Sequence, residues 1–151
     1  MFNMIIKNMV KKTFDALNRG DYHPLLKMCA TNVVHTFPGQ HALGGTRNSV
    51  KGLEDWFNRL FKLLPNLTYK IEDIEVDGPV NDCKVIIRWQ DQAMTSDGKE
   101  YANQGTYTLH VKNTKVVEII TYLEDVHKLN EVCERLAQLG VEEASAAQIE
   151  Y

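Results

Sequence analysis

Five polar residues in the second half of the chain have the types and spacing of an acid–base site: Asp91, Asn103, Tyr107, Tyr122 and Glu124. Two carboxyl groups held close together and partly removed from water differ in pKa, so one can donate a proton while the other accepts one. The amide and the phenols can bind a carbonyl or hydroxyl group. The competing interpretation is that both carboxylates stand at strand ends in water, where acidic residues are usually found.

The pairing of the predicted strands decides whether these residues meet. A two-residue turn at 113–114 and a turn centred on Asp97 fix the register of three strands. Apolarity favours this register, because a shift of one residue would turn Arg88, Gln90 and Gln92 inward. The expected neighbours are Tyr107 with Ile120, Gly105 with Trp89 and Tyr122, and Asn103 with Asp91 and Glu124.

The first half of the chain predicts helices. Apolar residues at helical spacing indicate one helix up to Leu17, a short one after Asp21, and a third over 53–64 that ends before Pro65. Between them, Val33 to Phe37 is typical of a short strand, and the segment 38–48, with three glycines, is typical of a long loop that can act as a lid.

After Pro65 the apolar period changes to two, which predicts four antiparallel strands. The alternation slips by one residue at Glu72-Asp73, and a β-bulge there would bend the sheet. A last helix ends at Gly140. We therefore expect one α+β domain over 1–140, in which helices pack on a strongly bent antiparallel sheet, and an alanine-rich tail over 141–151 that frays.

Composition narrows the class of protein. The chain has 151 residues, 44% of them hydrophobic, and a net charge of −3, which suits one globular domain. Its basic residues are scattered, which argues against nucleic-acid binding, and no apolar run has the length of a membrane span. Cys29, Cys83 and Cys133 are far apart in apolar segments, as expected of reduced thiols in a cytoplasmic protein; a free catalytic thiol is the less favoured alternative.

Three segments, VKKTFDALNRGDY, VVHTFPGQHALGGTRNSVKGLEDWF and TLHVKNTKVVEIITYLED, resemble the nuclear-transport-factor-two-like superfamily, in particular its SnoaL-like and ketosteroid-isomerase-like branch. The resemblance implies a cone-shaped α+β barrel, often a homodimer packed through the outer sheet face. It also aligns Glu124 with an acidic residue at the end of the last strand. Steroid isomerisation is disfavoured, because Phe37 and Thr13 stand where those isomerases place an aspartate base and a tyrosine.

The remaining candidates would line the cone. His35 is in phase with Phe37 on the first strand and is a candidate general base, although a hydrogen-bonded structural histidine is the commoner case. No histidine pair has metal-ligand spacing and no glycine-rich phosphate loop is present, so we expect chemistry without metal or cofactor. The expected ligand-binding residues are Phe14, Phe37, Trp56, Phe57, Trp89, Asn103 and Tyr122, beside the catalytic candidates Glu124, Asp91, His35 and Tyr107.

Two functions are open at this point. The first is a homodimer whose conical pocket binds a small, mostly apolar molecule with one or two polar groups, with acid–base catalysis of an isomerase, cyclase or hydrolase type. The second is a non-catalytic assembly or partner-binding module that keeps the fold and fills the cone with its aromatic side chains. The superfold hosts both kinds, so the residues of the cone must decide between them.

Overall fold

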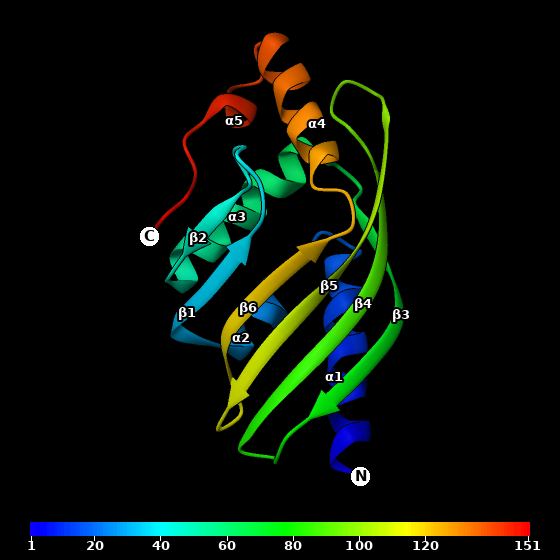
Figure 1. The fold of residues 1–151 in the computed structure, drawn as a ribbon, viewed down its shortest axis with the longest axis vertical. Helices are drawn as coiled ribbons and strands as arrows, with labels where there is room; N and C mark the ends of the chain where they lie inside the picture. The colour runs from blue at the N-terminus through cyan, green and yellow to red at the C-terminus, as the bar shows by residue number, and fades with distance from the viewer.

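The computed structural model describes residues 1–151, and its helices and strands follow the expected order (Figure 1). The expected α+β cone is confirmed. The elements are α1 (Phe2–Leu17), α2 (His23–Met28), β1 (Cys29–Phe37), β2 (Gly45–Arg47), α3 (Val50–Leu63), β3 (Thr68–Asp77), β4 (Asp82–Met94), β5 (Glu100–Lys112), β6 (Lys115–Leu123), α4 (His127–Gln138) and α5 (Glu142–Ser145).

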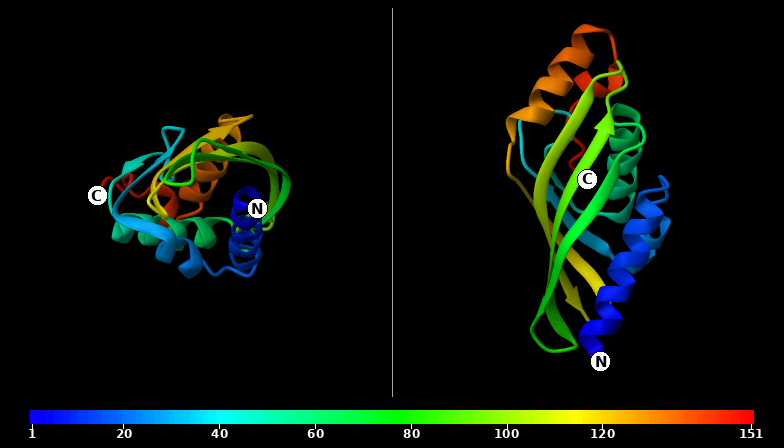
Figure 2. Two further views of the ribbon diagram at one scale, coloured as in Figure 1. Left: turned by 90° about the horizontal axis from the view of Figure 1, so that it is seen from below. Right: turned by 90° about the vertical axis from the view of Figure 1, so that its right-hand side faces the viewer.

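The six strands form a single curled sheet in the order β2-β1-β6-β5-β4-β3. Figure 2 shows that the sheet wraps around the helices without closing on itself. The sequence predicts antiparallel strands throughout, but β1 runs parallel to β6. Residues 38–48, expected as a loop, contain the short strand β2, which pairs with the end of β1. These two pairings bring His35 and Phe37 into the sheet beside the strands of the predicted site.

Helix α3 fills the concave side of the sheet. The Ser49 side chain accepts a hydrogen bond from the Gly52 N–H at 3.0 Å and so caps the helix. One stripe of α3 is buried in the main core, as its helical apolar spacing predicts. This stripe comprises Leu53, Trp56, Phe57, Leu60 and Leu63. The expected aromatic stripe of α3 therefore contributes Trp56 and Phe57 to the interior of the cone.

Two β-bulges shape the β3–β6 part of the sheet. The predicted bulge in β3 is confirmed, because Ile71 pairs with Trp89 while Asp73 pairs with Arg88, leaving Glu72 without a partner. A second, unpredicted irregularity lies in β6. Lys112 pairs with Lys115 as expected, yet the pairing shifts by one residue beyond Val111. Each later side chain of β6 therefore changes face.

The C-terminal tail packs against the domain, and the expectation that it frays is wrong. Arg47 Nε donates to the Ile149 carbonyl oxygen at 3.1 Å, and an Arg59 N–H donates to the Ala147 carbonyl oxygen at 2.8 Å. A side chain at Gly52 would collide with the Tyr151 carbonyl oxygen, so the close approach of the tail to α3 requires glycine there. Alanine-rich composition misled the prediction because the partners of the tail are arginines from distant segments.

Two general features bear on the class of protein. All three cysteines are free and buried, as expected of reduced core thiols. None of the helices combines the length and the apolar character needed to span a membrane.

Candidate functional site

Asp91 is the most unusual ionisable group in the cone. It pairs with Asn103 across β4 and β5 as the sequence predicts, and its side chain turns inward with 8% exposure. Its Oδ1 atom is buried and has no hydrogen-bond partner. Burial raises the pKa of Asp91 to about 6. A carboxyl group in this state can exchange a proton near neutral pH, which suits a general acid or base.

Two phenols lie near enough to this carboxyl group to be affected by its charge. Tyr69, on β3 directly opposite Asp91, has its hydroxyl 2.8 Å from the hydroxyl of Tyr107. Burial, reinforced by the nearby Asp91 charge, raises the pKa of both phenols, so both stay protonated at neutral pH. The indole Nε1 of Trp89 is likewise buried without a partner, and its ring lies 5.0 Å from the Tyr107 ring. The inner face of the sheet thus presents several donors beside one acid.

A cavity of about 30 Å³ lies at the centre of the cone. It has room for about two water-sized groups. Four polar residues, Thr13, His35, Tyr69 and Tyr107, contribute to its wall. The rest of the wall consists of Val10, Phe14, Leu17, Leu25, Met28, Trp56, Phe57, Ile87, Leu109 and Ile119. Phe37 and Trp89 stand behind this wall in contact with Trp56 and Tyr107, so the predicted aromatic positions enclose the cavity.

His35 reaches the cavity in a defined tautomer. Its Nδ1 atom lies 2.6 Å from Arg47 Nη1, and a guanidinium can only donate. Nδ1 therefore accepts, and the ring proton sits on Nε2, for which the protein provides no acceptor. Burial and the Arg47 charge lower the pKa of His35, so the ring is neutral. His35 is 2% exposed, and the structure makes it a hydrogen-bond donor to the cavity as well as a candidate base.

Two predicted site residues lie outside the cone. Tyr122 is 66% exposed, and Glu124 is exposed with its N–H donating to the Gln104 carbonyl oxygen at 2.9 Å. The shift in β6 is the cause, since it turns Thr121 and Leu123 inward instead. Glu124 therefore lacks the burial that its predicted role beside Asp91 requires.

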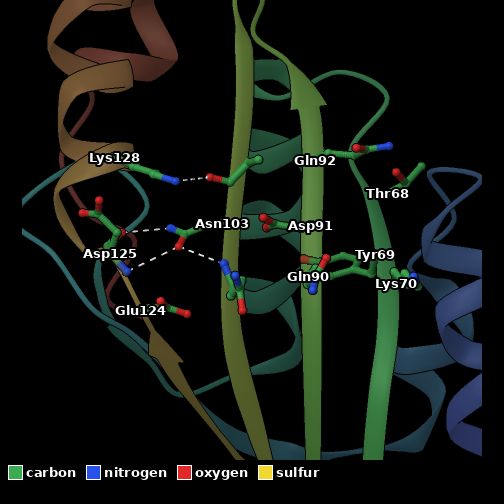
Figure 3. Close-up of a pocket in the computed structure, with 12 residues that line it drawn as sticks. Thr68, Tyr69, Lys70, Gln90, Asp91, Gln92, Asn103, Glu124, Asp125 and Lys128 are labelled. Carbon is green, nitrogen blue, oxygen red and sulfur yellow. Dashed lines mark hydrogen bonds between the residues drawn. The ribbon is translucent and has the colours of Figure 1, made fainter.

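Glu124 borders a surface groove of about 420 Å³, which we call the outer groove, and Asp91 also contributes to the lining of this groove (Figure 3). Asn103 holds one side of it together: its Nδ2 donates to the Asp125 carbonyl oxygen at 2.9 Å, and its Oδ1 accepts from the Gln104 N–H at 2.9 Å. Lys128 donates to the Ala102 carbonyl oxygen at 2.7 Å. Asn103 thus fixes the chain that leaves β6, a structural role next to Asp91.

Sequence reasoning missed two residues of the site. Tyr69 shares the odd-numbered inward phase of Leu67 and Ile71, and counting back from the turn at 77–79 would have placed it near Asp91. Arg47 stands in the segment expected as a loop, and no local pattern reveals that it is fully buried against His35. The position of Tyr69 could therefore be predicted from the sequence. The position of Arg47 depends on the pairing of β2 with β1.

Comparison with known proteins agrees with this geometry. Bal32a, from a soil-derived mobile gene cassette, superposes with a TM-score of 0.76 at 16% identity over 87% of this chain and 98% of its own. PrhC of Penicillium brasilianum gives 0.77 at 16% identity over 95% and 96%. TerC, co-crystallised with polyporic acid, gives 0.73 at 14% identity over 89% and 99%. At these identities the likeness establishes the fold.

No curated protein matches the sequence. The model of the SnoaL-like domain matches residues 10–119, which run from α1 into β6 and include Asp91, Tyr107 and His35. The match covers most of the chain and the whole wall of the central cavity. The chain therefore belongs to the SnoaL-like domain family.

Proposed function

We propose that this protein binds a small, mostly apolar organic molecule inside its cone and that Asp91 exchanges a proton with it. The observation that carries the proposal is the state of Asp91, which is a buried carboxyl group with an unpaired oxygen and a pKa of about 6. Leaving a buried polar atom unpaired costs about 1–3 kcal/mol. Such an atom is better explained by a ligand group that pairs with it than by a contribution to folding.

The surrounding groups suit proton transfer next to an oxygen of the ligand. Tyr69 and Tyr107 share one hydroxyl–hydroxyl bond, so one phenolic proton is available to a carbonyl or hydroxyl oxygen. Asp91 would then remove or return a proton on an adjacent atom. This division of roles fits isomerase- or cyclase-type chemistry without a cofactor. The co-crystallisation of TerC with polyporic acid supports small organic molecules as ligands of this fold.

The proposal is tested by titration and binding together. Carbon-detected NMR of the side-chain carboxyls should give Asp91 a pKa near 6. Naphthol, an apolar ring with one hydroxyl, should quench tryptophan fluorescence saturably, and Tyr107→Phe should weaken its binding by the worth of one hydrogen bond, about 0.5–1.5 kcal/mol. Tyr122→Phe is the matched control, because that phenol lies on the outer face. An Asp91 that titrates like a surface aspartate would remove the acid–base role.

The second candidate is the non-catalytic assembly module. One observation favours it: the central cavity is only about 30 Å³, so the ligand-free cone is almost filled by its own aromatic side chains. Small-molecule sites usually measure about 300–1,000 Å³. If neither naphthol nor any comparable probe binds, while the protein still forms a defined oligomer, this candidate is the better account.

We also propose a homodimer through the outer sheet face. The register places Ile86, Thr108 and Ile120 in one row across three strands, and Arg88, Thr106 and Tyr122 in the next. Ile120 and Tyr122 are exposed there, although the sequence placed them inside the cone. An apolar centre with a polar rim is the usual composition of a subunit interface. The β6 bulge therefore strengthens the case for the expected dimer.

A further inference from the structure

A second apolar pocket opens at the end of the molecule opposite α4. It measures about 230 Å³ and lies between the N-terminal half of α1 and the ends of the strands, as the course of α1 in Figure 2 indicates. We call it the entrance pocket. All but one of its lining residues are hydrophobic: Phe2, Ile5, Ile6, Met9, Val10, Met28, Val80, Val85, Leu109, Val111, Thr114 and Val116. Such a concentration of apolar surface at an opening indicates an apolar occupant.

The entrance pocket and the central cavity are neighbours. Val10, Met28 and Leu109 line both, so these three side chains form part of the wall between the two spaces. Met28 is the most adaptable of them, since an unbranched thioether changes rotamer easily. Its sulfur makes one weak contact, 3.9 Å from the Thr13 hydroxyl. A modest movement of Met28 would therefore join the two spaces into one narrow channel from the surface to His35.

The inner end of this channel has a positive character. Arg47 is fully buried, and its hydrogen-bond partners are His35 Nδ1 and the carbonyl oxygens of Ile149 and Gly44. No carboxylate of the protein pairs with it. Burial lowers the pKa of Arg47 to about 10, and the charge of Glu150 in the tail only partly offsets this effect. Between this charge and the cavity stands His35, whose Nε2–H has no acceptor in the protein.

We propose that the channel binds an alkyl carboxylate, with the carboxylate accepting the His35 Nε2–H bond in front of Arg47 and the chain lying past Met28 in the entrance pocket. Charge complementarity selects the head group, and the narrow apolar channel selects a single unbranched chain. This inference rests on the proposed function in one respect, namely that the cone interior accepts a small molecule. It adds the class of that molecule and the route by which it enters.

The test compares the binding of octanoate to the full chain with the binding of octanol, a neutral ligand of equal length. Both affinities are measured by calorimetry. A hydrogen bond to a charged group is worth about 1.5–3 kcal/mol, so octanoate should bind about tenfold or more tightly than octanol. His35→Phe should abolish this preference, so that octanoate binds no more tightly than octanol. Equal affinity for the two ligands in the natural protein would overturn the assignment of the head group.

Two exposed methionines of α1 test the route without disturbing the core. Met9, 43% exposed, lines the entrance pocket, whereas Met4, 67% exposed on the same helix, does not. Met9→Glu should weaken octanoate binding about tenfold, because it adds a negative charge at the opening, and Met4→Glu should leave it unchanged. Equal binding by both variants would overturn the route.

Other outcomes separate this inference from the proposed function. If naphthol binds and octanoate does not, the channel assignment fails while the cone remains a binding site. If neither binds, both fail. If Met9→Glu and Met4→Glu both halve the mass measured by sedimentation, the apolar surface of α1 is a contact between two copies of the chain, and the inference is overturned.

Discussion

At the scale of single residues, the two carboxylates of the predicted site show what a sequence can and cannot reveal. Asp91 was placed correctly because the β4–β5 pairing follows from one turn and has no irregularity in between. Glu124 was placed wrongly because its position depends on every residue of β6 being paired regularly. The raised pKa of Asp91 also has no local signal, since it comes from burial by residues of several elements.

Asp91 should make the protein less stable as pH rises. Its folded pKa of about 6 lies above its ordinary value of 3.8, so the folded state holds a proton that the unfolded state has lost between these two values. Stability therefore falls over this window and stays reduced above it, by on the order of 2–3 kcal/mol. Asp91→Asn should lose this dependence. Urea unfolding of the natural protein and of the variant from about pH 4 to about pH 8 measures this loss of stability. If the difference between their free energies of unfolding stayed constant over this range, the raised pKa of Asp91 would be contradicted.

Among the elements, the two bulges explain why the sequence predicts the inward side chains of β3 correctly and those of β6 wrongly. Around Glu72 the apolar residues stand on both phases, Ile71 on one and Ile74 on the other, so regular pairing would expose one of them. Around Val117 the sequence gives a weaker sign of an irregularity. Regular pairing would have turned Glu118 inward together with Val116, and this buried charge was the available signal for a second irregularity.

The contact between α4 and the β4–β5 turn gives a prediction at the same scale. Arg135 Nε donates to Asp97 Oδ2 at 2.6 Å and ties the helix to the turn. Arg135 lowers the pKa of Asp97, so this contact is fully formed above the ordinary pKa of a carboxyl and is lost as pH falls through the lowered value. Arg135→Gln should speed hydrogen exchange in α4 and in residues 95–99.

Arg88→Gln is the control for that experiment. Arg88 and Asp73 form an ion pair at 3.2 Å with both side chains more than half exposed, and such pairs contribute little to stability. Its hydrogen exchange should match that of the natural protein. If the two variants behave alike, the α4 contact is no stronger than an ordinary surface pair.

In the whole molecule, the concave face of the sheet carries the proposed binding site and the outer face carries the proposed dimer contact. The concave face holds Asp91, the tyrosine pair and His35, and the C-terminal tail contributes by holding Arg47 in place. The fold class and the aromatic wall were accessible to sequence reasoning because they follow from periodicity. The position of Arg47 was not, because it depends on three segments that meet only in the folded chain.

The outer face of the sheet carries the proposed dimer contact. Ile120→Lys places a charge at the β6 end of the row formed with Ile86 and Thr108, and burying that charge in an interface would cost several kcal/mol. Sedimentation equilibrium at micromolar concentration should therefore give twice the 17.3 kDa of one chain for the natural protein and a single chain for the variant. Val80→Lys, at an exposed apolar residue in the turn between β3 and β4, should remain dimeric. A natural protein with the mass of one chain would leave the apolar outer face without a partner and remove the dimer, and a dimer broken only by Val80→Lys would move the contact to the α1 end.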